Sequence, residues 1–157
     1  GVAPGAFGTS VQAGPLAAFD GADSFVPHPY ARGVALIGDA AATSDPSFGS
    51  GMALTVLSAQ LLADELLGSG AFDPAAVDAA GHRYAHAFAA AYGSLRRQVD
   101  WLTDFYRTPG PAADALREKL YPLHAAEPWR VPDVVGAGPA GASDEAARRA
   151  FLGEDVI

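Results

Sequence analysis

The apolar run from Val34 to Ile37 leads directly into Gly38-Asp39, and this junction constrains the fold more than any other part of the chain. A continuous apolar run, here preceded by Gly33, is typical of a strand that is buried on both faces of a sheet. A loop rich in glycine and proline follows, and an apolar helical pattern then spans residues 52–67 before Gly68. The predicted order is therefore strand, glycine-rich loop and helix.

This junction has the chemistry of a ligand site. Gly38 lets a bulky group approach the backbone, and an ionised Asp39 can accept hydrogen bonds from two adjacent hydroxyls. The stretch Gly49-Ser50-Gly51 presents backbone N–H groups at the start of the helix, where the helix dipole carries about half a positive charge. A polyol chain and a ring that becomes anionic fit these groups, and a flavin has both. The residues alone leave open an ordinary strand, turn and helix start.

The whole string from Val34 to Met52 resembles the second FAD-contacting motif of the para-hydroxybenzoate-hydroxylase-like flavoprotein monooxygenases. That motif is an apolar strand, Gly-Asp-Ala-Ala, a few residues, and then Pro-x-x-Gly-x-Gly and a helix. The corresponding segments are Gly38 to Ala41 and Pro46 to Gly51. The spacing from Asp45 to Gly51 is also similar to that of flavin-dependent halogenases and related reductases of the same superfamily.

The resemblance implies a role for each matching position. Asp39 would hold the ribityl hydroxyls, Pro46 would lie against the isoalloxazine, and the amides of Gly49 to Met52 would stabilise negative charge on the pyrimidine edge. The predicted cofactor-binding residues are Gly38, Asp39, Pro46, Gly49, Ser50, Gly51 and Met52. Catalytic residues stay unassigned, and no metal site is predicted. Three positions depart from the family pattern: Ala42 stands where His is frequent, Ala53 where Asn is frequent, and Ser58 where many members place Asp.

By this resemblance the chain is the C-terminal portion of an FAD-dependent oxidoreductase, an α+β fragment of an α/β FAD-binding flavoprotein monooxygenase. Residues 1–31 would form the end of the substrate-domain sheet and the connection to the next segment. Residues 32–68 would form the second FAD-contacting segment, and residues 69–157 a mostly helical region. We expect the N-terminal dinucleotide-binding part to lie upstream of Gly1. The chain alone is then not expected to be a competent enzyme.

The expected activity is that of a monooxygenase which hydroxylates or epoxidises a small organic substrate through a C4a-hydroperoxyflavin. NAD(P)H or a partner reductase would supply the electrons. Two alternatives remain open at this point. One is a halogenase or reductase on the same scaffold, and the other is a non-catalytic fragment that requires a partner for FAD binding.

Further helices are predicted downstream. Asp73-Pro74 supplies an N-cap and a first-turn proline for a pattern that continues to Tyr106, as one helix or as two in series with kinks at Gly81 or Gly93. Helices are also expected at about 112–120 and at 143–151, and a short strand at 14–19. The apolar positions of the long pattern are Val77, Tyr84, Phe88, Tyr92, Leu95, Val99, Leu102 and Tyr106.

Three weaker signals in the sequence are each better explained by a structural role than by ligand binding. Gly136, Gly138 and Gly141 match G-x-G-x-x-G, but too little chain follows for a βαβ unit, so a turn is predicted. The side chains of Asp78, His82 and His86 share one helix face, where surface or packing roles are favoured over metal binding. Phe48 and Trp101 are expected in the core, with pocket lining as the alternative.

Composition narrows the class of protein. The net charge is −8 and the chain has no cysteine, which argues against a nucleic-acid partner, disulfides and thiolate metal sites. The first residues lack a basic start followed by an apolar run, so neither a signal peptide nor a membrane partner is expected. A cytoplasmic location is the default expectation.

Overall fold

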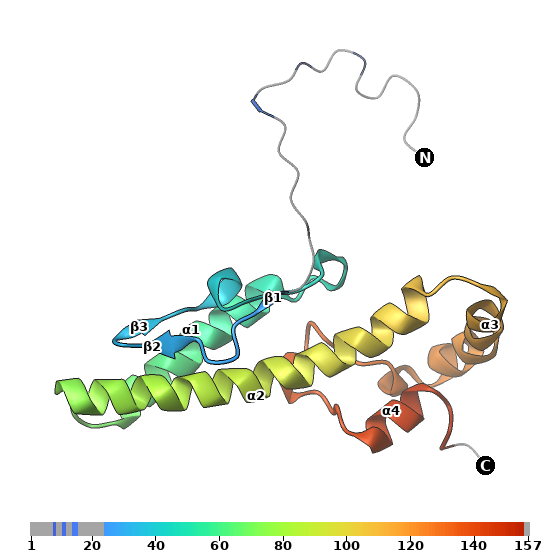
Figure 1. The fold of residues 1–157 in the computed structure, drawn as a ribbon. Coiled ribbons are helices and arrows are strands. Elements are labelled where there is room, and N and C mark those ends of the chain that lie inside the picture. Colours follow the sequence, from blue (N-terminus) through green and yellow to red (C-terminus); the bar gives the residue numbers. More distant parts are fainter. Residues whose placement is uncertain (1–7, 9–10, 12–13, 16–23, 156–157) are drawn as a thin grey trace.

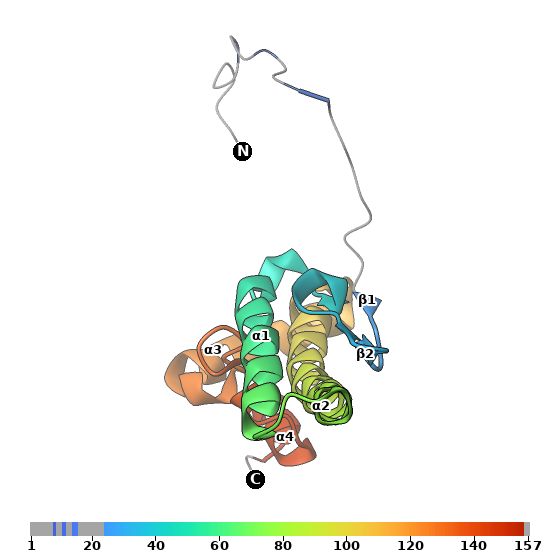
Figure 2. The ribbon, with the colours of Figure 1, turned by 90° about the vertical axis from the view of Figure 1, so that its left-hand side faces the viewer.

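The computed structural model of the chain describes residues 24–155 together with Gly8, Val11, Gly14 and Pro15. A long helix, α2 (Pro74–Arg107), forms the spine of this part of the molecule, and α1 (Gly51–Gly68) lies beside it (Figures 1 and 2). Helices α3 (Pro111–Ala126) and α4 (Glu145–Phe151) gather around the C-terminal part of α2 (Figure 1). The described residues thus form an α+β structure that is mostly helical, as expected. Most of the strand predicted at 14–19 lies outside them.

Four two-residue strands form two small antiparallel ladders. Strand β1 (Ser24–Phe25) pairs with β4 (Ala42–Thr43), and β2 (Tyr30–Ala31) pairs with β3 (Val34–Ala35). The β2 and β3 strands are joined by Arg32 and Gly33, whose φ angles of 50° and 81° are those of a type I′ hairpin turn. The twist of this turn matches the twist of the two strands it joins.

The expectation of a strand at 33–37 buried on both faces is wrong. Only Val34 and Ala35 are in a strand, Val34 is 62% exposed and Ile37 is 39% exposed. The β2–β3 ladder has two strands among the described residues, and the Val34 side chain lies on a side of it that is open to solvent. An apolar run of this length predicts a strand but does not say whether other elements cover both faces of that strand.

Helix α2 is a single continuous helix, which settles the choice between one helix and two. Asp73 caps it by accepting hydrogen bonds from the amides of Ala75 and Ala76, both at 3.0 Å. Gly81 gives room for a neighbouring ring, since a Cβ built there would overlap the buried ring of Tyr30. The glycine at this position therefore serves close packing and does not kink the helix.

The apolar face of α2 forms most of the core. Tyr84, Phe88, Tyr92, Leu95, Val99 and Leu102 are buried as expected. Tyr106 is 48% exposed, and its neighbour Phe105 is buried in its place. Phe105 lies edge to face against Phe151, with ring centroids 5.5 Å apart. The last apolar position of the predicted pattern is therefore wrong by one residue: Phe105, and not Tyr106, faces the core.

Helix α3 is longer than expected, because it continues through Pro122 to Ala126. The missing N–H of Pro122 costs one hydrogen bond near the helix end, while the residues on either side are held by packing. Leu120 and His124 are buried there. Helix α4 starts later than the predicted residue 143, because Asp144 is its extended N-cap and accepts from the amide of Ala147 at 2.9 Å.

None of the described helices combines the length and the apolar character needed to cross a bilayer.

Candidate functional site

Gly38 begins a short 3-10 turn, η1 (Gly38–Ala40), and is tied to α1. Its amide donates to Ser58 Oγ at 3.0 Å, and the Ser58 hydroxyl in turn donates to the carbonyl of Thr55 at 2.7 Å. Its φ of 56° is in the left-handed region, and a Cβ on Gly38 would lie 2.9 Å from Thr55 Oγ1. Both the backbone conformation and the contact with α1 therefore require glycine.

Asp39 follows in the same turn and is exposed. Its carboxylate makes no hydrogen bond or ion pair with the described residues. An ionised carboxylate has several acceptor sites, so Asp39 is free to receive hydrogen bonds from a ligand. This is the arrangement that a polyol-binding role requires.

The proline loop is a second 3-10 turn, η2 (Pro46–Phe48), fixed at both ends. Asp45 caps it by accepting from the amide of Ser47 at 2.9 Å, and its carboxylate also forms an ion pair with Arg107 at the end of α2. These hydrogen bonds from Ser47, with a further contribution from Arg107, lower the pKa of Asp45 against the opposing effect of burial. Pro46 itself is exposed, while Phe48 is half-buried and packs against the core.

The loop then turns into α1. Gly49 has a φ of 68° and closes η2 in the left-handed conformation. Ser50 is buried, and its hydroxyl lies 3.2 Å from that of Ser44 instead of capping the helix. The amide of Leu54 is the first to bond back, to the Ser50 carbonyl at 2.9 Å. The first-turn amides from Gly51 onward are therefore left without an intrahelical acceptor.

All seven predicted cofactor-binding residues lie in or beside these two turns and the first turn of α1. Gly38, directly before Asp39, lies against Thr55 and Ser58, and the Thr55 hydroxyl donates to the Gly51 carbonyl at 3.0 Å, so η1 lies beside the N-terminal half of α1. Met52 is 83% exposed, and Ala53 beside it is exposed as well. The structure brings the predicted residues into one region, and their role stays a prediction.

Two residues that hold this region were not predicted as site residues. Thr55 and Ser58 attach η1 to α1, and Ser58 is fully buried. The sequence signal for this attachment is Ser58, a polar residue inside the otherwise apolar stripe of α1. Of the other family departures, Ala42 is buried in β4 and Ala53 is exposed on the first turn of α1.

The G-x-G-x-x-G segment forms turns, as predicted, and packs against α2. It contains a 3-10 turn, η4 (Gly138–Ala140), and residues 131–135, directly before it, form no strand. The buried side chain of Gln98 donates from Nε2 to the carbonyl of Gly138 at 3.0 Å, and Ser94 donates to that of Pro139 at 2.9 Å. These bonds give the segment a structural role.

The histidines of α2 take part in a packing cluster. His82 Nδ1 lies 2.8 Å from Nε2 of His28, and the ring of His86 lies edge to face against His28 at 5.5 Å. The Tyr30 hydroxyl donates to Asp78 at 3.0 Å, and burial together with this carboxylate raises the pKa of Tyr30. No group of three or more His, Asp or Glu side chains in the described part of the chain is arranged to hold a metal ion.

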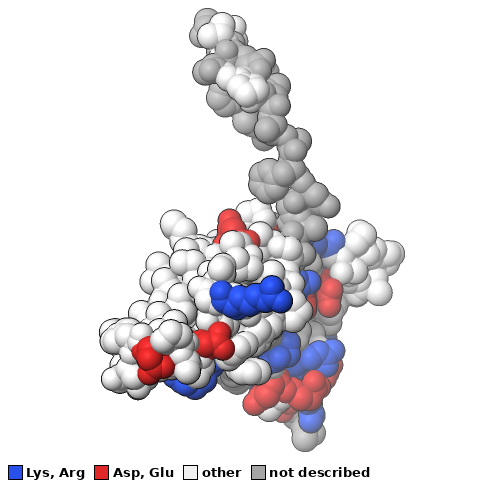
Figure 3. Space-filling view, turned by 60° about the vertical axis from the view of Figure 1, so that its left-hand side comes forward, with Lys and Arg blue, Asp and Glu red and all other residues white. Residues whose placement is uncertain are grey.

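On the face drawn in Figure 3, Lys and Arg side chains occur singly or beside Asp and Glu. Comparisons with protein-family models, with curated proteins and with solved structures found no match for this chain.

Proposed function

We propose that the two turns and the helix start between Gly38 and Met52 hold the ribityl and pyrimidine side of FAD in a flavin-dependent oxidoreductase. The observation that carries this proposal is the Asp39 carboxylate, exposed and unpaired by the described residues, in a turn that packs against the N-terminal half of α1. The carboxylate would accept from the ribityl hydroxyls, and the first-turn amides would face the electron-rich edge of the ring.

The residues present fit the cofactor. Gly38 allows the backbone to pass close to α1, and the αL turn at Gly49 directs the chain into the helix without covering its first amides. The ion pair between Asp45 and Arg107 fixes the position of the Pro46 turn relative to α2. A site that is held in place before the ligand arrives loses less entropy on binding.

The activity we favour is that of a monooxygenase acting on a small organic substrate, with electrons from NAD(P)H or a partner reductase. Bound flavin would supply the redox and oxygen chemistry, while this chain binds, orients and polarises it. A separate N-terminal portion would hold the adenosine and pyrophosphate end of FAD. A halogenase or a reductase on the same scaffold would use the same contacts with the cofactor.

The test is a flavin titration of the ¹⁵N-labelled chain followed by amide chemical shifts. We expect added FMN to shift the amides of Gly38, Asp39 and Gly49 to Ala53 selectively. Asp39→Ala should weaken binding by about 1–3 kcal/mol, roughly 5- to 150-fold, because charge-assisted hydrogen bonds are lost. Asp64→Ala, an exposed carboxylate on α1, is the matched control and should leave the affinity unchanged. Absence of selective shifts, or equal effects of both variants, would refute the proposed site.

A further inference from the structure

A cavity of about 560 Å³ lies between α2, the segment 128–133 and α4, built from residues other than the proposed flavin contacts. Trp101 of α2, Val131, Pro132 and Ala147 of α4 give it apolar walls. Its volume lies within the range of small-molecule pockets, which bury most of their ligand against apolar side chains. Trp101, expected mainly in the core, is half-buried and lines this cavity.

Both tryptophans of the chain line the cavity. Trp129 follows Pro128 in a 3-10 turn, η3 (Pro128–Arg130), and is 68% exposed. The guanidinium carbon of Arg130 lies 4.6 Å from the centroid of the Trp129 ring, so this ring already contacts one cation through its face. Tryptophan has the strongest cation–π attraction of the side chains.

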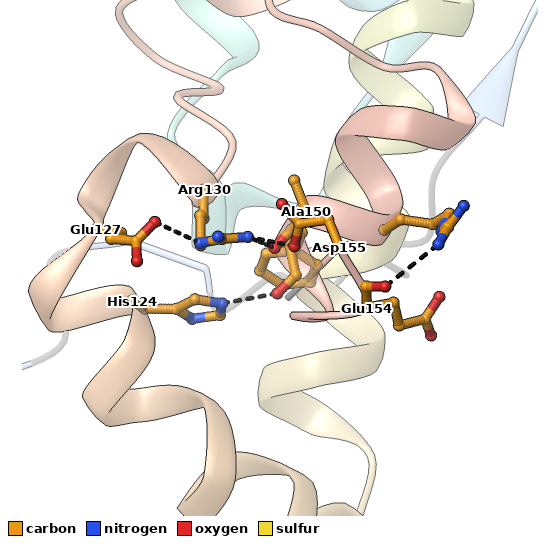
Figure 4. A network of polar contacts seen from close by, with 8 residues as sticks. His124, Glu127, Arg130, Ala150, Glu154 and Asp155 are labelled. Carbon is orange, nitrogen blue, oxygen red and sulfur yellow. Dashed lines mark hydrogen bonds and ion pairs between the residues drawn. The ribbon is translucent and has the colours of Figure 1, made fainter. Parts of the chain in front are cut away.

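The charge at the cavity favours a cation. Arg130 is the one basic residue among the described residues that line it, and its guanidinium is bonded to Glu127 at 2.9 Å and to Asp155 at 2.6 Å (Figure 4). Asp133 and Asp144, both exposed, also line the cavity. Glu127 and Asp155, which neutralise Arg130, do not line the cavity. The carboxylates of Asp133 and Asp144 therefore give the cavity a negative charge.

Gln98 adds a polar group to the wall. Its Nε2 donates a hydrogen bond to the carbonyl of Gly138, but its Oε1 is buried and accepts no hydrogen bond in the described part of the molecule. A buried acceptor without a donor is energetically unfavourable, because it has lost its hydrogen bonds to water. A ligand that brings an N–H group, directly or through a water, would relieve this cost.

We propose that this cavity binds a small organic cation with an aromatic body, of the arylalkylamine class. The aromatic body would pack between the tryptophans and the apolar wall, and the ammonium group would lie toward Asp133 and Asp144. The same charges would disfavour an anion of equal size. This proposal is independent of the flavin site, because no residue is shared between the two.

The test uses phenethylammonium, with 2-phenylethanol as the neutral analogue and phenylacetate as the anionic one. Because both tryptophans line the cavity, their fluorescence reports occupancy directly. We expect a saturable change with phenethylammonium, an affinity about tenfold lower for the alcohol, and no saturation with phenylacetate. Equal responses to the three compounds, or no saturable response to the amine, would overturn the proposal.

Two variants locate the binding. Asp133→Asn combined with Asp144→Asn should remove the preference for the amine over the alcohol, and Asn keeps the N-cap of α4 because it caps about as well as Asp. Ala147→Leu should narrow the cavity and lower the affinity for both compounds. Asp64→Asn and the exposed Ala79→Leu on α2 are the matched controls. An unchanged preference in the Asn variant contradicts the proposal even where Ala147→Leu disturbs α4.

Discussion

The two glycines inside α2 have opposite consequences when a methyl group is added. A Cβ at Gly81 would overlap the ring of Tyr30, which is buried and hydrogen-bonded to Asp78. A Cβ at Gly93 would meet only Arg97 Nη1, at 3.7 Å. We expect Gly81→Ala to destabilise the chain by about 1–3 kcal/mol and Gly93→Ala to stabilise it by about 0.5–1 kcal/mol. Urea unfolding followed by circular dichroism measures both, and a stabilised Gly81→Ala chain would contradict the packing described here.

The hydrogen bond between Arg130 and Asp155 makes the stability of the C-terminal segment depend on pH. Donation from the Arg130 guanidinium is the main reason that the pKa of Asp155 lies below its ordinary value of 3.8 (Figure 4). The folded chain therefore binds this proton less tightly than the unfolded chain does. The pair stabilises fully above the ordinary pKa, and this contribution is lost as the pH falls through the lowered value.

Asp155→Asn should accordingly lower the free energy of unfolding at pH 7, with a difference from the wild type that shrinks below the ordinary carboxyl pKa. Urea unfolding at a series of pH values measures it. Asp64→Asn, which removes an exposed carboxylate of α1, is the matched control and should change the free energy of unfolding little. A difference that stays constant from neutral to strongly acidic pH would show that Arg130 does not hold this carboxylate.

At the scale of the element, the start of α2 depends on one side chain. Asp73 satisfies two first-turn amides, and Pro74 removes a third donor. Asp73→Ala should cost about 0.5–2 kcal/mol, whereas Asp73→Asn, which keeps an oxygen acceptor, should cost little. Thermal unfolding of the two variants decides this, and an equal loss in both would mean that the charge and not the cap matters.

Helix ends with a local signal were predictable, because capping is local. Asp73 begins α2 and Gly68 ends α1 where the sequence indicates. The end of α3 was not predictable in this way, since the helix continues through Pro122 to Ala126. The extent of burial was not predictable in the same way. Val34 and Ile37 are exposed because burial depends on how many elements cover a strand, which no local pattern encodes.

The candidate site shows the same division. The order of Gly38, the proline turn and the start of α1 was predictable, since glycine and proline constrain backbone locally. The attachment of Gly38 to Thr55 and Ser58 was not, because it joins residues about twenty positions apart. Nor could spacing show that Trp101 and Trp129 line one cavity, since they come together only through the packing of the segments after α3.

At the scale of the whole molecule, α2 runs through one continuous hydrophobic core, within which two groups of buried residues contact different elements. Toward its N-terminal half, Phe88 and Tyr84 pack with the strands and α1, and the Tyr84 hydroxyl donates to the Leu36 carbonyl at 2.6 Å. Toward its C-terminal end, Phe105 packs with Phe151, and His124 Nε2 lies 2.8 Å from the Phe151 carbonyl oxygen. The proposed flavin contacts belong to the first group, and the cavity adjoins the second.

This division predicts local opening that depends on which group is disturbed. Phe151→Ala leaves a cavity that costs about 3–5 kcal/mol, and we expect it to speed hydrogen exchange mainly in α3, α4 and the last turns of α2. Phe88→Ala, a change of the same size, should do so in α1 and in residues 24–48. Hydrogen exchange measured by mass spectrometry distinguishes the two patterns. Identical exchange profiles would mean that α2 couples both groups into one cooperative unit, and that the flavin contacts and the cavity cannot open separately.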